Sequence, residues 1–135
     1  MTLIGLFTMH NLRKSLVFLM VLSATSTLMS TTKPTGKKVT VHGYLVDIAC
    51  VLERKSESEH LGQIHTKKCL QMPACERSGY AVMDSQNNVY KFDAPGNEIA
   101  KKLISATDKD KDWRIVVSGK LLGDQLTVAK LQIQK

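Results

Sequence analysis

The order of short alternating segments along the chain constrains its fold more than any other feature. Between Val39 and Ile48, apolar residues alternate with polar ones, which is the pattern of a half-buried strand. Similar strands are predicted over Tyr80–Asp84, Val89–Phe92, Trp113–Leu121 and the residues that follow Gln125. Between the third and fourth strands, apolar residues recur at helical spacing: Ile99, Ala100, Leu103 and Ile104. The pattern therefore predicts an all-β domain with one helix.

Turn and cap residues predict how these elements are joined. Ser85–Asn88 separates the second strand from the third and is typical of a hairpin turn. Asp93–Asn97 ends the third strand, and Asn97 is suited to cap the helix, with Glu98 in its first turn.

Two irregularities are expected inside the strands. Gly43 lies within the first strand and indicates a bend. In the last strand the apolar parity changes between Val128 and Leu131, so we expect a one-residue bulge near Ala129–Lys130. The resulting order, β-β-β-α-β-β with a bent first strand, is that of a small five-stranded OB-fold barrel. A flat sheet with one packed helix is the alternative.

The first part of the chain has the pattern of a secretory signal. Arg13 and Lys14 precede a short apolar run, Ser15–Leu22, whereas a membrane-spanning helix needs about 20 apolar residues. Small residues follow, and we expect cleavage after Ser26, with Ser30 as the second choice; an uncleaved N-terminal anchor is the alternative. The predicted organisation is a signal peptide over 1–26, a flexible segment over 27–37 and an OB-fold-like domain over 38–135. The mature protein is therefore expected in the periplasm or outside the cell, without a transmembrane segment.

The charge balance bears on the partners of the protein. The chain has 19 Lys and Arg against 12 Asp and Glu, a formal net charge of +7. Removal of residues 1–26 takes away two basic residues, so seven minus two leaves a net charge of +5. Because the basic residues are scattered, we expect no nucleic-acid partner. Outside the cytosol a basic surface meets an anionic envelope component more often, and a small ligand is the other expected partner.

The segment Asp47–Gly79, which connects the first two strands, carries the residues suited to chemistry. It contains all three cysteines and two histidines: Cys50, His60, His65, Cys69 and Cys75. The segment far exceeds a hairpin loop of about 2–5 residues, and such long connections are usually functional or disordered. His65 and Cys69 are four residues apart, so a helix within Glu57–Cys69 would point both to one side.

Three interpretations of the cysteines remain open. A disulfide in an exported protein stabilises the fold by about 2–4 kcal/mol, but three cysteines leave one thiol over. Three thiolates and an imidazole suit a soft metal ion, Zn(II) or Cu(I), although the tight C-x2-C spacing of most zinc sites is missing. Basic residues beside the cysteines would lower thiol pKa values for redox chemistry, although the sequence has no C-x-x-C.

Each interpretation assigns roles to particular residues. The candidate metal ligands are Cys50, His65, Cys69 and Cys75, with Asp47 and His60 as further candidates. The disulfide interpretation favours Cys69 with Cys75, because Pro73 promotes a turn between them, and it leaves Cys50 as the spare thiol. Pairing of Cys50 with Cys69 or Cys75 would close a larger loop and is the alternative.

A wider pattern includes these residues. It consists of G-Y-L-V-D-I-A-C over Gly43–Cys50, H-x3-C-x5-C-x3-G-Y over His65–Tyr80, V-Y-K-F over Val89–Phe92, and strand motifs at Val117–Gly119 and Leu126–Val128. The pattern resembles a family of small exported bacterial proteins of unknown function, which are similar to OB-fold barrels and carry D-x-x-C before a His/Cys loop. The resemblance covers residues 39–133. It implies the fold, export and the Cys/His cluster, and it supplies no catalytic residue.

The sequence favours an exported binding module of the cell envelope whose ligand is not identified, and a soft metal ion held by the Cys/His cluster is the candidate ligand. The alternatives are a structural or interaction protein with a disulfide-stapled segment, and a small thiol redox protein. Motifs of haem attachment, zinc proteases, phosphate-binding loops and serine hydrolases are missing from the sequence, so an enzyme is not favoured. Trp113 is expected in the core, because it shares one strand face with Ile115 and Val117.

Overall fold

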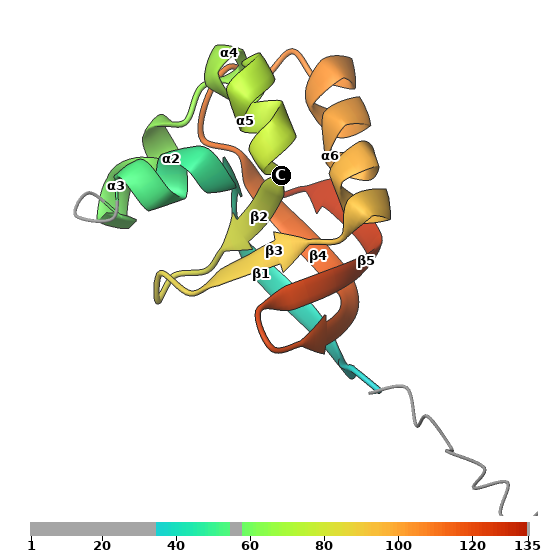
Figure 1. The fold of residues 1–135 in the computed structure, drawn as a ribbon. Helices are drawn as coiled ribbons and strands as arrows, with labels where there is room; N and C mark the ends of the chain where they lie inside the picture. Colours follow the sequence, from blue (N-terminus) through green and yellow to red (C-terminus); the bar gives the residue numbers. More distant parts are fainter. Residues whose placement is uncertain (1–34, 55–57, 135) are drawn as a thin grey trace, which may run out of the picture. The chain divides into compact units, whose positions relative to one another are not determined.

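The computed structural model describes residues 35–54 and 58–134, with the backbone alone for residues 58–60. In this part of the chain, five strands close into a barrel in the order β1-β2-β3-β5-β4 (Figure 1). The strands are β1 (Lys37–Asp47), β2 (Tyr80–Met83), β3 (Val89–Phe92), β4 (Arg114–Leu122) and β5 (Gln125–Ile133). A helix, α6 (Ala94–Ala106), stands between β3 and β4. The predicted five-stranded, OB-fold-like barrel is confirmed, whereas the predicted signal peptide over 1–26 lies outside the described residues.

Strand β1 joins two parts of the barrel because it pairs with two neighbours. Lys37–Tyr44 pairs with β4 and Tyr44–Asp47 pairs with β2, so the change of partner falls beside Gly43. A Cβ atom at Gly43 would lie 2.2 Å from the carbonyl oxygen of Met83, so a side chain has no room there. Closure is completed by β3 and β5, which pair in parallel.

The β4–β5 pair contains the bulge that the sequence predicts. Ser118 faces Lys130, but the next residue, Gly119, faces Val128, so Ala129 is the extra residue. Apolar residues on both sides of the bulge are buried: Leu126, Val128 and Leu131. The bulge therefore keeps both halves of β5 turned toward the core.

The main apolar core fills the barrel and the space beneath α6. Trp113 is fully buried, as predicted, and its indole N–H donates to the carbonyl of Asp110 at 3.1 Å. The predicted helical stripe also faces this core: Ala100 and Ile104 are buried in it, and Ile99 and Leu103 pack against it. The aromatic ring and the helix thus pack into one continuous core.

Helix α6 begins earlier than the sequence analysis predicts. Asp93 is its N-cap, and the Asp93 Oδ1 atom accepts the N–H of Gly96 at 3.0 Å. Pro95 stands in the first turn, where its missing N–H costs nothing, and this favours the earlier start. The prediction that Asn97 is the cap is therefore wrong: Asn97 lies inside the helix, and its Oδ1 atom accepts the N–H of Tyr80 at 2.8 Å.

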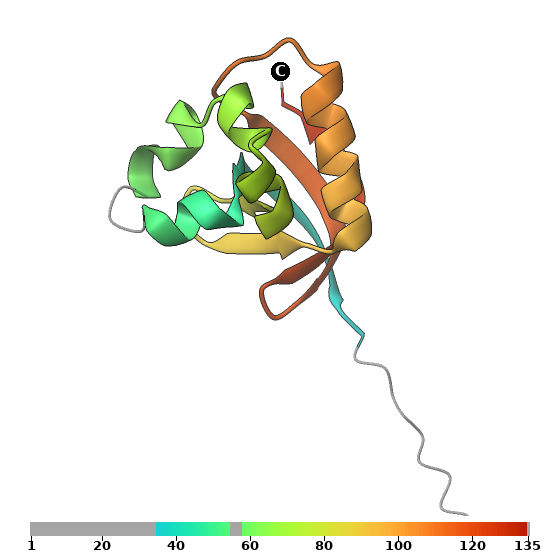
Figure 2. The same cartoon turned by 45° about the horizontal axis from the view of Figure 1, so that its top comes forward.

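The connection between β1 and β2 is folded into helices. Its described residues form α2 (Ile48–Glu53), α3 (Ser58–Ile64), α4 (Lys67–Leu70) and α5 (Pro73–Ser78). Figures 1 and 2 show these helices together on the same side of the barrel as α6. We call Ile48–Ser78 the helical insert. The expectation of one helix in the domain is corrected, and so is the expected turn shared by His65 and Cys69, because Thr66 starts a new helix between them.

The helical insert is attached to the barrel in two ways. A second apolar cluster lies between the insert and the strands, with these buried members: Val46, Leu61, Ala81 and Met83. The loop after α6 makes hydrogen bonds to the middle of the insert. The N–H of Lys67 donates to the carbonyl of Asp110 at 2.5 Å, and the Lys67 ammonium donates to the carbonyl of Thr107 at 2.7 Å. The insert is therefore positioned by the barrel.

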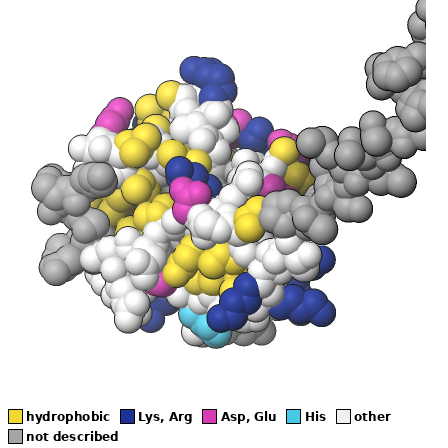
Figure 3. All heavy atoms as spheres, turned by 60° about the horizontal axis from the view of Figure 1, so that its bottom comes forward, with side chains coloured by type: hydrophobic (Ala, Val, Ile, Leu, Met, Phe, Trp, Pro, Cys, Tyr) yellow, Lys and Arg dark blue, Asp and Glu magenta, His cyan; other side chains and the backbone are white. Residues whose placement is uncertain are grey.

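On one face of the molecule the charged side chains are scattered. Figure 3 shows one face, on which Lys and Arg side chains occur at separate places among apolar and acidic side chains. Across the described residues, no helix combines the length and the apolar content that crossing a membrane requires.

Candidate metal centre

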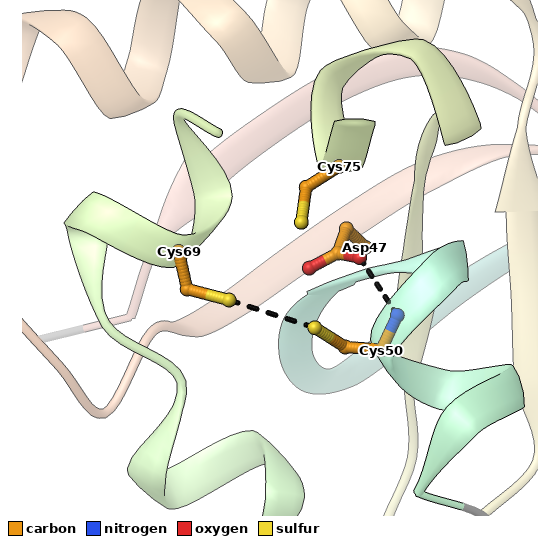
Figure 4. Close-up of side chains that lie close together, drawn as sticks. All are labelled: Asp47, Cys50, Cys69 and Cys75. Atoms are coloured by element: carbon orange, nitrogen blue, oxygen red, sulfur yellow. Dashed lines mark hydrogen bonds between the residues drawn. The ribbon is translucent and has the colours of Figure 1, made fainter. Parts of the chain in front are cut away.

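All three cysteines occupy the same position in their helices. Cys50, Cys69 and Cys75 are the third residues of α2, α4 and α5, respectively. Helical side chains lean toward the N-terminus of their helix, so a thiol in the first turn points toward that end. The first turns of the three helices meet, and the thiols converge with the carboxylate of Asp47 (Figure 4).

Two of these helices start with the same local arrangement. Asp47 caps α2, and its Oδ1 atom accepts the N–H of Cys50 at 2.9 Å. Thr66 caps α4, and its hydroxyl oxygen accepts the N–H of Cys69 at 3.2 Å. Helix α5 begins at Pro73 without a side-chain cap. Each of these two capping bonds runs to the backbone N–H of the cysteine, which lies in the first turn of its helix.

Neighbouring side chains hold the helices in place. Tyr80, the fully buried first residue of β2, donates its hydroxyl to the carbonyl of Leu70 at 2.7 Å. Burial, together with nearby carboxylates, raises the pKa of Tyr80, so the hydroxyl keeps the proton that it donates. Ser78 donates to the carbonyl of Cys75 at 2.7 Å and accepts the N–H of Ala49 at 3.1 Å. These bonds attach α4 to the barrel and α5 to α2.

Four side chains form what we call the Asp/Cys cluster: Asp47, Cys50, Cys69 and Cys75. One donor atom from each lies within 4.8 Å of the donor atoms of the others, and the Cys50 and Cys69 Sγ atoms are 3.5 Å apart. Asp47 and Cys75 are buried, whereas Cys50 and Cys69 are half-buried. The cluster therefore has a closed side and a more accessible side.

His65 reaches the cluster through Asp47. The His65 Nε2 atom lies 2.6 Å from the Asp47 Oδ2 atom, and both side chains are buried. Burial acts to raise the pKa of Asp47, but the hydrogen bonds from His65 and from the N–H of Cys50 outweigh it and lower the pKa. Asp47 is therefore an anion in the fold. A carboxylate has about four lone-pair sites, so these two bonds leave capacity for another partner.

The environment of the cluster disfavours free thiolates. Burial, contact with Cys69 and the negative charge of Asp47 raise the pKa of Cys50. Burial and the same carboxylate raise the pKa of Cys75 to about 12. Both thiols stay protonated at neutral pH unless a cation replaces their protons.

A pocket of about 170 Å³ opens onto the accessible side of the cluster. It is lined by Cys50, Arg54, Leu61, Ile64, His65, Thr66 and Cys69. Cys75 and Asp47 are not part of this lining, which agrees with their burial. The pocket is therefore a route to the Cys50–Cys69 side.

The structure gathers the predicted site residues differently from the sequence-based assignment. The three cysteines meet as expected, but the fourth converging donor is Asp47, and His65 stands one hydrogen bond behind it. His60 lies in α3, and its side chain is outside the described part of the chain. All three cysteines are free thiols, so the predicted Cys69–Cys75 disulfide is not formed in this structure. The thiols in contact in this structure are instead those of Cys50 and Cys69.

Comparison with known proteins gives no relative. No protein-family model, curated protein or solved structure matches this chain. The function therefore has to be argued from the chemistry of the cluster.

The dimensions of the cluster fit a tetrahedral metal ion. Two sulfur atoms bound to one Zn(II), each at about 2.3 Å, lie about 3.8 Å apart. The Cys50–Cys69 distance of 3.5 Å is close to that value, and the 4.8 Å limit leaves about 1 Å of contraction at the longest edge. The four donor atoms therefore lie near enough to one another to hold a metal ion.

Proposed function

We propose that this protein is an exported binding module whose helical insert holds one soft metal ion through the Asp/Cys cluster. One observation carries the proposal: three thiols and an ionised carboxylate, from three helices and a strand end, bring their donor atoms within 4.8 Å.

The donor set favours Zn(II) over Cu(I). Zn(II) accepts thiolate and carboxylate ligands together in a tetrahedral site, whereas Cu(I) prefers soft sulfur ligands. Asp47 is buried and ionised, so a metal site here includes a hard oxygen ligand. His65 then acts as the outer partner that orients this carboxylate, as such partners do in many zinc sites.

The raised thiol pKa values make metal binding at the cluster depend on pH, because the thiols of Cys50 and Cys75 hold their protons in the metal-free protein. A divalent ion would replace the protons and be held by four ligands, so binding would release protons to solvent.

The site of action that we propose is the cell envelope. The signal-like residues before Ser26 and the net charge of the remaining chain support export and contact with anionic envelope material. The D-x-x-C and H-x3-C-x5-C motifs support membership in the family of small exported proteins that the sequence resembles. A disulfide-stapled interaction protein is the competing function.

A zinc titration tests the proposal. The reduced, metal-free protein is titrated with Zn(II) against a chromophoric chelator, and with Co(II) to record thiolate-to-metal absorption. We expect one equivalent of metal per chain, bound with the absorption of a tetrahedral thiolate site. Serine at Cys50, Cys69 or Cys75, or asparagine at Asp47, should weaken binding and reduce this absorption.

Asp84→Asn is the matched control for Asp47→Asn. Asp84 is also a hydrogen-bonded carboxylate with a lowered pKa, but it lies in the β2–β3 turn, outside the cluster. Its variant should bind zinc like the unmodified protein. Weak, non-stoichiometric binding, or unchanged binding by Cys75→Ser, would contradict a metal site in the cluster.

A further inference from the structure

The Cys50–Cys69 pair differs from the rest of the cluster in a way that suggests control of metal binding. We propose that this pair is a redox gate: its oxidation to a disulfide releases the metal ion, and its reduction restores the site. The inference rests on the proposed function, because it needs a metal ion in the cluster. It goes further by assigning the two accessible thiols a regulatory reaction.

Distance favours this pair. The two Sγ atoms are 3.5 Å apart, and a disulfide bond needs about 2.05 Å. The helices that carry them, α2 and α4, have six and four residues, so a shift of about 1.5 Å falls on short elements. Figure 4 shows the two sulfur atoms pointing toward each other.

Access favours the same pair. Cys50 and Cys69 both line the 170 Å³ pocket, whereas Cys75 is 5% exposed and lies outside that lining. An oxidant that enters the pocket therefore reaches Cys50 or Cys69 first. Cys75 lies behind them and stays a thiol. In this proposal the third cysteine is a metal ligand that takes no part in the disulfide.

The reaction is an exchange with an external disulfide, the oxidant class that exported proteins meet. One thiolate attacks the external disulfide and forms a mixed disulfide, and the first external thiolate leaves. The second cysteine then attacks the mixed disulfide, so that a Cys50–Cys69 bond forms and the second external thiolate leaves. The pair loses two electrons, the external disulfide gains them, and its two thiolates take protons from solvent. The metal ion has lost two of its four ligands and departs unchanged in oxidation state.

The test follows zinc and thiols in the same sample. The full chain is reduced, loaded with Zn(II) and exposed to oxidised glutathione, while a chromophoric chelator records zinc release. Free thiols are then labelled with one alkylating reagent, and disulfide thiols are labelled with a second reagent after reduction. Because residues 70–74 contain no Lys or Arg, Cys69 and Cys75 fall in one tryptic peptide, which is sequenced by mass spectrometry.

We expect the second label on Cys50 and Cys69, the first label on Cys75, and loss of the bound zinc equivalent in step with the disulfide. Dithiothreitol should restore zinc binding. Cys75→Ser keeps both reactive thiols, so the metal-free variant should form the same disulfide, whereas Cys50→Ser should form no intramolecular disulfide with Cys69.

Two results would overturn the redox gate alone: a disulfide that contains Cys75, or retention of zinc after Cys50 and Cys69 have been oxidised. Failure of the reduced protein to take up zinc would overturn the proposed function, and the gate with it. The labelling of the metal-free protein separates these cases, because it reports which thiols pair whether or not zinc binds.

Discussion

Asp47 uses its two oxygen atoms for two different neighbours. Oδ1 accepts the N–H of Cys50 and so starts α2, and Oδ2 meets His65 at 2.6 Å. The same carboxylate lies within reach of the three thiols. A buried anion with two hydrogen bonds is held in one orientation, so in our proposal His65 orients the carboxylate toward the metal ion.

Replacing His65 should therefore weaken metal binding without removing a ligand. For His65→Gln we expect a loss of zinc affinity of about 10–100-fold, as for other outer partners of metal ligands. The cobalt–thiolate absorption should remain, because all three sulfur ligands remain. His42→Gln is the control, since His42 is exposed on β1, and its affinity should match that of the unmodified protein. Loss of a nitrogen ligand from the metal spectrum would show instead that His65 binds the ion directly.

The raised thiol pKa values make the stability of the metal-free protein depend on pH. The pKa of Cys75 is about 12 in the fold against 9.0 as the reference value, so folding favours the protonated form. This contribution is fully present below about pH 9 and is lost as the pH rises toward 12. Urea denaturation measures the unfolding free energy at pH 7 and at pH 10. The decrease from pH 7 to pH 10 should be smaller for Cys75→Ala than for the unmodified protein. An equal loss in both proteins would contradict this assignment.

Among the elements, β1 has the least freedom to change. It pairs with both β2 and β4, and Gly43 passes so close to Met83 that a Cβ atom there would lie 2.2 Å from a carbonyl oxygen. The contact is with backbone, so one of the two strands has to move if a side chain is added. Because β1 ends in Asp47, we expect that displacement to reach the Asp/Cys cluster.

Gly43→Ala should destabilise the barrel by about 1–3 kcal/mol, the usual cost of overpacking. Urea denaturation measures the change, and His42→Ala on the same strand should stay within about 0.5 kcal/mol of the unmodified protein. We also expect weaker zinc binding in Gly43→Ala than in His42→Ala. A Gly43→Ala protein as stable as the His42→Ala protein would mean that β1 tolerates the extra atom.

Some elements were predictable from the sequence because their signals are local. Strand alternation and the parity change at Ala129 correctly predicted the barrel strands and the bulge in β5. The start of α6 was not predicted, because Asp93 and Asn97 are both good caps and the choice between them depends on Pro95 and on a long-range bond to Tyr80. Local capping rules allow a helix start at Asn97, whereas the tertiary contact of Asn97 with Tyr80 places Asn97 inside the helix.

The candidate site was predictable only in part. The spacing Asp47-x-x-Cys50 and Thr66-x-x-Cys69 is that of an N-cap followed by the third helical residue, and this signal is visible in the sequence. The lengths of the short helices in the insert follow from where Gln71 and Gly79 end α4 and α5, and the N-cap spacing alone does not indicate these ends. The hydrogen bond between His65 and Asp47 had no local signal in the sequence, because it depends on how the insert folds back on β1.

At the scale of the whole molecule, the core and the cluster are separate. The main core is formed by the barrel and α6, and from the helical insert it takes Leu70 as a buried member. The barrel therefore has its own source of stability. The insert depends on the second apolar cluster, on the loop after α6 and, in our proposal, on the metal ion.

Metal removal should loosen the insert and leave the barrel folded. Hydrogen exchange with and without a chelator should show faster exchange in α2, α4 and α5, and unchanged protection in β4 and β5. Zinc at about 100 times its dissociation constant should add about 2.7 kcal/mol to the unfolding free energy by mass action. Cooperative unfolding of the whole chain on chelation, as in a zinc finger, would contradict this separation.

The ligands of the bound ion test the central claim most directly. X-ray absorption at the zinc edge of the reduced, zinc-loaded protein measures the type and distance of each neighbouring atom. The Asp/Cys cluster predicts three sulfur atoms at about 2.3 Å and one oxygen atom at about 2.0–2.2 Å. A first shell with an imidazole nitrogen in place of the oxygen, or with fewer than three sulfur atoms, would contradict the site.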